Sequence, residues 1–265
     1  MISKIFFFLK IIKELIGSIH YRRTSENKKL MTEPSFPPDK YCLLAFKGTS
    51  LFKLSLKNQQ CLVNKINEAY GKTFKKYNII VGDRIADVTK FERDSGFSSH
   101  PECCYFYAFI EKDPSVYLPL KESTTTKREV FENYEVFFIT EEDDAILNLN
   151  DDCIKASTAF KPHHEYAPNL KVIEPTCFVS FLPRLGLLFL PLTERHFQTV
   201  YDVEKYVIEV VKEHDLVGYY LKNHNYKLIG ETHNPQTFDP ESSGVPQDFK
   251  LNSSFHLSKM EKNLK

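Results

Sequence analysis

A serine directly after a short apolar run is the first residue in the sequence that could do chemistry. Tyr41–Lys47 has the apolar character of a buried strand, and a Gly-Thr-Ser turn ending at Ser50 follows it. Asp83 comes after a second apolar run, over residues 77–82. Ligands of open α/β sheets bind beyond the carboxyl ends of the strands, so we expect Ser50 and Asp83 to lie close together. Ser50 is the candidate nucleophile and Asp83 its partner, although capping a helix is the commoner task of such a serine.

Histidine and cysteine residues form two groups that could bind a metal ion. His100 and Cys103 lie close together, and His163 is followed by a second histidine and a glutamate. A zinc site needs three or four such groups that converge on one point, whereas neighbouring side chains on an extended chain point to opposite faces. We therefore predict no metal ion, and His100, Cys103 and His163 are the best candidates for ligands. The acidic stretch over residues 141–152 lacks the glycine of a calcium loop, which favours a solvated acidic face.

The composition excludes several function classes. The chain has 265 residues, with 35 Lys and Arg against 35 Asp and Glu. This zero net charge argues against general nucleic-acid binding, which needs many cations to neutralise phosphates. With nine glycines there is no GxGxxG, Walker loop or GxSxG, so no cofactor is predicted. The six cysteines form no CxxC pair and, apart from the adjacent Cys103 and Cys104, are widely spaced, which favours a reducing compartment and hence a cytoplasmic protein.

The hydrophobic periodicity predicts the elements that must position these residues. Apolar side chains at helical spacing predict a helix over residues 54–74, between the two apolar runs. A strand, a helix and a strand in this order favour a right-handed parallel unit. Further along, the patterns predict a hairpin over 177–190 and a helix over 194–214. The predicted fold class is α/β or α+β, a single domain whose mixed sheet opens with a parallel β-α-β unit.

Composition shifts divide the chain into four segments. Residues 1–30 hold seven cations and two acids around apolar residues at helical spacing, which predicts an amphipathic basic helix. That helix could dock on the domain, lie on a membrane surface, or precede a working start at Met31. A proline-rich linker is predicted over 31–40, the globular domain over 41–231, and a disordered tail over 232–265.

The run from CLLAFKGTS to NIIVGD, residues 42–83, resembles the opening of tRNA-dependent cyclodipeptide synthases. Both have a strand, a Gly-x-Ser turn, a helix and a second apolar strand. In that family the serine after the first strand receives the aminoacyl group from charged tRNA. The resemblance therefore implies a transferase in which Ser50 takes that role, with tRNA as a partner.

Two function classes remain open, and the sequence does not decide whether the protein is an enzyme. The first, which we favour, is a non-catalytic binding protein that meets a protein partner or an anionic membrane surface, docked there by its N-terminal helix. The second is a transferase that uses Ser50 and Asp83. Nucleic acid is not expected as a partner except for tRNA in the second case. The oligomeric state and the substrate are not predicted.

Overall fold

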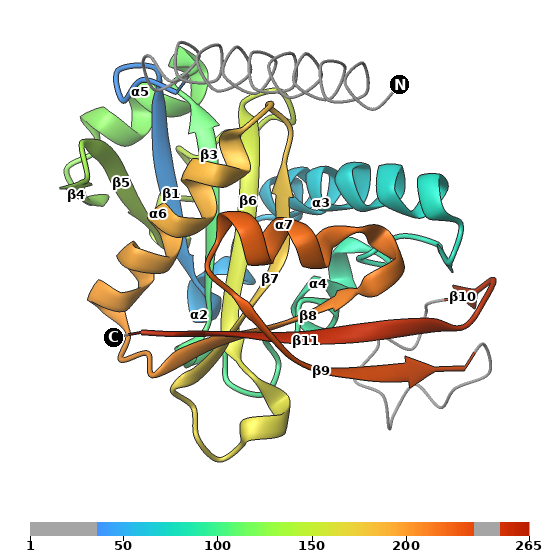
Figure 1. The fold of residues 1–265 in the computed structure, drawn as a ribbon. Helices are drawn as coiled ribbons and strands as arrows, with labels where there is room; N and C mark the ends of the chain where they lie inside the picture. The colour runs from blue at the N-terminus through green and yellow to red at the C-terminus, as the bar shows by residue number, and fades with distance from the viewer. Residues whose placement is uncertain (1–35, 236–249, 265) are drawn as a thin grey trace, which may run out of the picture. The chain divides into compact units, whose positions relative to one another are not determined.

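A nine-stranded mixed sheet forms the centre of the computed structural model, which describes residues 36–235 and 250–264 (Figure 1). The strand order is β4-β5-β1-β3-β6-β7-β8-β11-β9. Two neighbouring pairs, β1–β5 and β7–β8, are parallel, and the other six described pairs of this sheet are antiparallel. The predicted fold class, a single α/β domain with a mixed sheet, is confirmed.

The elements of the described residues have the following bounds. The strands are β1 Tyr41–Lys47, β2 Ile80–Val81, β3 Tyr105–Glu111, β4 Lys127–Phe131, β5 Tyr134–Ile139, β6 Ile154–Pro162, β7 Val172–Ser180, β8 Lys205–Val211, β9 Lys227–Asn234, β10 Lys250–Leu251 and β11 Phe255–Asn263. The α-helices are α2 Gly48–Leu51, α3 Leu56–Tyr77, α4 Phe91–Asp94, α5 Pro114–Glu122, α6 Leu185–Val200 and α7 Leu216–Asn223. No helix among them is long and apolar enough to cross a membrane.

Helices cover both faces of the sheet because its central strands are apolar on both faces. Along β3, Phe106 and Ala108 join the core that includes α3, whereas Phe109 packs its ring against Phe189 of α6. Successive side chains of a strand point to opposite faces, so α3 and α6 lie on opposite sides. In a sheet that is buried on both faces, the sequence of each strand is a continuous apolar run rather than an alternation of apolar and polar residues.

Helix α3 confirms the predicted helix after the first strand. Its buried stripe includes Leu62, Val63 and Ile66, and it ends where Asn78 adopts a left-handed conformation. The predicted acidic face contributes to the start of this helix: the Asp144 carboxylate accepts hydrogen bonds from the Ser55 N–H at 3.0 Å and from the Asn58 amide at 2.8 Å. A carboxylate there satisfies N–H groups that have no partner within the helix.

The predicted parallel unit over residues 41–82 is wrong in its second strand. Residues 80–81 form β2, which pairs antiparallel with β10 in a separate two-stranded sheet. The neighbours of β1 are β3 and β5 instead. Of the short run over residues 77–82 only Ile79 and Ile80 are buried, and a local apolar pattern does not specify the partner strand.

The predictions over residues 177–214 and for the tail are also corrected. The segment predicted as a hairpin and a helix is strand β7, helix α6 and strand β8. Most residues in the first turns of α6 are buried, so their sequence is a nearly continuous apolar run like that of a buried strand. The valines of β8 are spaced so that they also fit the period of a helix. Within the predicted disordered tail, residues 255–263 form β11, which lies between β8 and β9. The predicted helix over 1–30 lies outside the described residues.

Candidate functional site

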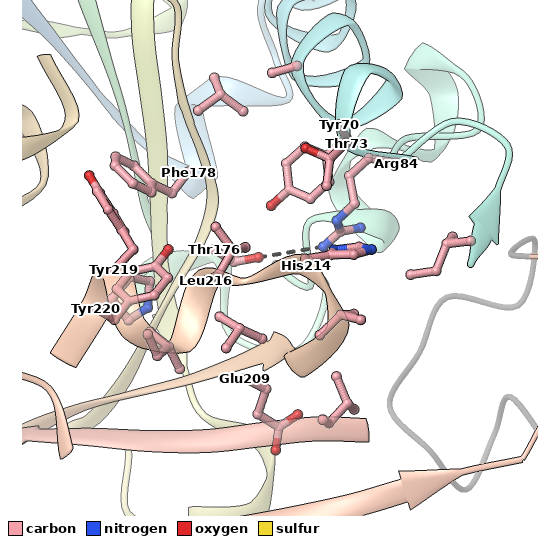
Figure 2. Close-up of a pocket in the computed structure, with 18 of the residues that line it drawn as sticks. Tyr70, Thr73, Arg84, Thr176, Phe178, Glu209, His214, Leu216, Tyr219 and Tyr220 are labelled. Carbon is pink, nitrogen blue, oxygen red and sulfur yellow. Dashed lines mark hydrogen bonds between the residues drawn. The ribbon is translucent and has the colours of Figure 1, made fainter. Parts of the chain in front are cut away.

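A cavity of about 470 Å³ lies between β7 and β8 (Figure 2). The two parallel strands pair only at Val172–Lys205 and Ile173–Tyr206. Beyond these pairs they separate, and the cavity is lined by Glu174–Thr176 and Phe178–Ser180 of β7 and by Ile208–Val211 of β8. It therefore lies at the carboxyl ends of parallel strands, where α/β sheets bind their ligands.

Local features of β7 explain why it leaves its partner. Pro175 has no N–H to donate to a neighbouring strand. Cys177 has φ of +49°, and the pairing with β6 shifts register between Ser157 and Ala159. A bulge of this kind bends a strand and increases its twist. β7 consequently stays joined to β6 while its other edge opens toward the cavity.

The cavity passes through the sheet from α3 to α7. Tyr70 and Thr73 of α3 line one end, and Tyr219 and Tyr220 of α7 line the other. Phe178 lies between them, with its ring 6.5 Å from that of Tyr220 (Figure 2). Aromatic walls with a few polar groups are typical of small-molecule sites.

A half-buried arginine, Arg84, supplies positive charge at the cavity. Arg84 donates to the Asp94 carbonyl at 2.6 Å. It also donates to the Thr176 hydroxyl at 3.5 Å (Figure 2). Its guanidinium also lies over the Tyr70 ring, 5.9 Å from the centroid. These contacts fix the guanidinium at the wall of the cavity, where it can interact with a carbonyl or an anion.

Two glutamates face the cavity in different electrostatic states. Although burial opposes it, the Lys161 ammonium, 2.5 Å from Glu174, holds the pKa of Glu174 below its usual value. Burial, together with Glu174 and Glu165, raises the pKa of Glu209 to about 7. The Glu209 carboxylate makes no hydrogen bond within the described residues; its nearest basic atom is Nε2 of His163 at 3.9 Å. Burial lowers the pKa of His163 to about 4, so this imidazole is neutral at pH 7.

The start of α6 lies beside the α7 end of the cavity. Ser180 lines the cavity and the chain reaches α6 four residues later. The residue before the helix, Arg184, makes no side-chain cap, and the first turn has no acidic residue. A methyl group on Gly186 would come within 2.7 Å of the Tyr219 hydroxyl, so α7 packs closely on this turn. The first-turn N–H groups of a helix attract anions.

Neither of the predicted catalytic residues, Ser50 and Asp83, lines the cavity between β7 and β8. Ser50 lies in α2, and the Lys53 ammonium, with a further hydrogen bond from Ser50, lowers the pKa of the Glu141 carboxyl to about 2. Asp83 is exposed and lines a second cavity, of about 800 Å³, beside α3. Ser50 lines neither of these two cavities. Their predicted catalytic roles stay predictions.

The predicted metal candidates separate into two places. His100 and Cys103 both lie near the Glu102 carboxylate, at 3.5 and 3.6 Å. His163 instead joins His164 and Glu174, and the ligand atoms of these three residues lie within 4.8 Å of one another. Within the described part of the chain, this trio is the group that could hold a metal ion.

A family model described as sporulation protein RMD6 matches residues 36–264. The chain belongs to the sporulation protein RMD6 family. A curated relative, sporulation protein RMD6 of Saccharomyces cerevisiae, is 27% identical over 240 residues, which cover 84% of this chain and 96% of the relative. The matched range contains both the β7–β8 cavity and the His163 trio.

Solved structures also match the chain. One is a probable acetyltransferase from Staphylococcus epidermidis, at 7% identity, covering 85% of this chain and 99% of its own, with a TM-score of 0.46. Another is spermidine N-acetyltransferase from Vibrio cholerae in complex with CoA and spermine, at 9% identity, covering 85% and 96%, with a TM-score of 0.45.

The family assignment overturns the resemblance to cyclodipeptide synthases. The match to the RMD6 family extends over residues 36–264, whereas that resemblance covered residues 42–83. Its pieces, an apolar strand, a Gly-x-Ser turn and a helix, occur in many α/β proteins because serine commonly caps helices. The aminoacyl role of Ser50 and tRNA as a partner lose the resemblance that implied them, and they stay untested predictions.

Sequence reasoning missed most residues of the β7–β8 cavity. Arg84 stands next to the predicted Asp83, but Glu174, Glu209 and Tyr219 were not singled out as site residues. The one sequence signal that could have indicated the cavity is Glu174-Pro175 inside an apolar strand. Proline is rare within a paired strand, so it indicates that the hydrogen bonding between neighbouring strands is interrupted there.

Proposed function

We propose that the protein is an acyltransferase that takes its acyl group from a coenzyme A thioester bound between β7 and β8. The observation that carries the proposal is the separation of these parallel strands after two residue pairs, which opens a cavity of about 470 Å³ between their edges. The pantetheine arm of coenzyme A is long and thin and has two amide groups. Unpaired peptide groups on a strand edge are suited to hydrogen-bond such an arm.

The start of α6 supports this choice of donor. Coenzyme A carries a pyrophosphate, and the first turn of α6 has neither a side-chain cap nor an acidic residue. The Leu185 and Leu187 N–H groups of this turn donate to the Leu182 and Arg184 carbonyls, so the positive end of the helix dipole is what would stabilise a bound phosphate. Tyr219 contacts this turn at Gly186 and also lines the cavity, so the two parts of the donor would lie in one continuous site.

The residues present can assist the transfer step. An amine or hydroxyl acceptor attacks the thioester carbonyl, the carbon–sulfur bond breaks, and the acceptor loses a proton while the thiolate gains one. Peptide N–H groups of β7 could stabilise the oxyanion. Burial raises the pKa of Tyr219, so its phenol is protonated at neutral pH and able to donate to the departing thiolate.

A binding protein without chemistry is the second candidate. The observation that favours it is the close packing of Tyr219 on Gly186, which covers the turn where the phosphates would bind. In that case the cavity would hold a ligand and the protein would act through a partner. The expected protein or membrane partner and the N-terminal docking helix remain part of this second proposal.

The test is calorimetry of the full chain with acetyl-CoA and with CoA, followed by thiol release with a panel of amines. Thr73→Trp should fill the cavity from α3, weaken binding at least tenfold and abolish thiol release. Gln60→Trp, exposed on the same helix beside the second cavity, is the matched control and should change neither. Binding without thiol release with any acceptor would favour the second candidate. Absence of CoA binding would refute the acyltransferase.

A further inference from the structure

We propose that His163, His164 and Glu174 form a binding site for one divalent metal ion of the zinc class. Their ligand atoms all lie within 4.8 Å of one another. Imidazole nitrogen and carboxylate oxygen are ligands that Zn²⁺ prefers. The site adjoins the β7–β8 cavity through Glu174, but the inference stands without any acyl transfer.

The hydrogen bonding of His163 points to a missing ligand. Its side chain is fully buried, and Nε2 has no hydrogen-bond partner in the described part of the chain. The other nitrogen, Nδ1, accepts one long contact of 3.3 Å from the Glu165 N–H. Buried polar atoms in native proteins nearly always have a partner. His214 and His224 also have unpartnered buried nitrogens, but among these three histidines of the described residues only His163 lies beside a second histidine and a glutamate that could share an ion with it.

The backbone holds the three side chains together. The His163 N–H donates to the Val172 carbonyl at 2.8 Å, which fixes the end of β6 beside the start of β7, two residues before Glu174. The rings of His163 and His164 stack with centroids 4.9 Å apart. Ligand atoms around a tetrahedral zinc ion stand about 3.3 Å apart. The three ligand atoms must therefore move closer together to bind one zinc ion. His164 can make this movement by changing its rotamer, because its side chain is exposed.

Charge in the surrounding groups suits a cation. Lys161 binds Oε2 of Glu174, which leaves the other oxygen of that carboxylate for an ion. Lys259 pairs with Glu165. Glu209, 3.9 Å from His163, is the one carboxylate here without an ammonium partner. It is positioned to be a fourth ligand, or to accept the Nε2 proton of a His163 bound through Nδ1, as carboxylates near metal-bound histidines commonly do.

The experiment measures zinc binding to the untagged full chain after chelator treatment, with no acyl donor present. We expect one Zn²⁺ per chain in competition with a chromogenic chelator, and visible Co²⁺ bands typical of four-coordinate nitrogen and oxygen ligation. His164→Ala and Glu174→Gln should each weaken binding at least tenfold. His164 is exposed, so its variant should keep the wild-type circular dichroism and melting temperature.

His256→Ala is the matched control. His256 stacks on His233 at 4.9 Å and its Nδ1 lies 2.8 Å from Glu213, so it belongs to a second His-His-Glu group, one without an orphaned buried nitrogen. This variant should bind zinc like the wild type. Absence of stoichiometric binding, or an equal loss in His256→Ala and His164→Ala, would overturn the site.

Discussion

Two buried histidines of this domain have opposite surroundings. His196 of α6 lies 2.9 Å from the Tyr107 hydroxyl through Nδ1 and 2.9 Å from the Glu129 carboxylate through Nε2. His163 is equally buried, yet its Nε2 has no hydrogen-bond partner among the described residues. Burying an unpartnered polar group costs free energy, so a protein retains one where something else satisfies it. The comparison separates a histidine that holds the fold together from one that is available to a ligand.

The His196 group joins three elements. Tyr107 belongs to β3, His196 to α6 and Glu129 to β4, the edge strand of the sheet. Burial lowers the pKa of His196, which keeps the ring neutral. A neutral ring that accepts from Tyr107 at Nδ1 and donates to Glu129 at Nε2 uses both of its nitrogens. The predictions below test whether hydrogen bonding of this kind divides structural from ligand-binding histidines.

The largest effect is expected for His196→Leu. This change leaves the Tyr107 hydroxyl, which is completely buried, without its acceptor and removes the link to Glu129. We expect the free energy of unfolding to fall by about 3 kcal/mol, as is typical of an unsatisfied buried group plus imperfect repacking. Urea denaturation followed by circular dichroism measures it. The double variant with Tyr107→Phe should cost less than the sum of the two single changes; strict additivity would contradict a shared network.

His224 extends the comparison to a buried ring with neither nitrogen partnered within the described residues. Burial, assisted by Lys262, lowers its pKa to about 4. The unfolded chain, with a histidine pKa near 6.5, then binds more protons than the folded one between pH 6.5 and 4, so stability falls as the pH falls through that window. The loss from this residue should reach about 2 kcal/mol by pH 5.

His224→Phe tests that prediction. The ring would remain among Phe178, Tyr219 and Tyr220, but it could not be protonated. We expect a shallower decline of the unfolding free energy between pH 7 and pH 5 than in the wild type. Identical pH profiles for the two proteins would mean that His224 is solvated or partnered in solution.

His163→Leu should have a smaller effect when zinc is removed by a chelator. The change deletes an orphaned nitrogen and one long contact, so we expect the free energy of unfolding to stay within about 1 kcal/mol of the wild type. Added zinc should then raise the melting temperature of the wild type but not of the variant. A loss as large as that of His196→Leu would show that the two histidines do not differ in role.

The smallest effect is expected for Ser50→Ala. Ser50 hydrogen-bonds Glu141 near the surface and lines neither cavity. We expect a change in unfolding free energy of less than about 0.5 kcal/mol, as for most surface substitutions, with unchanged thiol release. Loss of activity without loss of stability would instead support the catalytic role predicted from the sequence.

Local patterns were sufficient for some elements and misleading for others. The helix over 56–77 was predictable because its apolar stripe repeats at helical spacing and its other face is polar. Helix α6 was not, because its first half is buried on most sides and lacks a polar stripe. The strand β11 was hidden among Lys, Ser and Glu, and it is ordered by pairing with β8 and β9 on both sides. Pairing between distant strands leaves little trace in a local window.

The sequence by itself determined the fold class, because enough apolar residues recur at strand and helix periods to require a layered α/β domain. It also placed His163 and His164 among the possible metal ligands. Only the tertiary structure brought Glu174 and Glu209 to that pair and opened the cavity between β7 and β8. These groups come from separate strands, and whether a buried histidine is satisfied depends on partners that the chain supplies from many residues away.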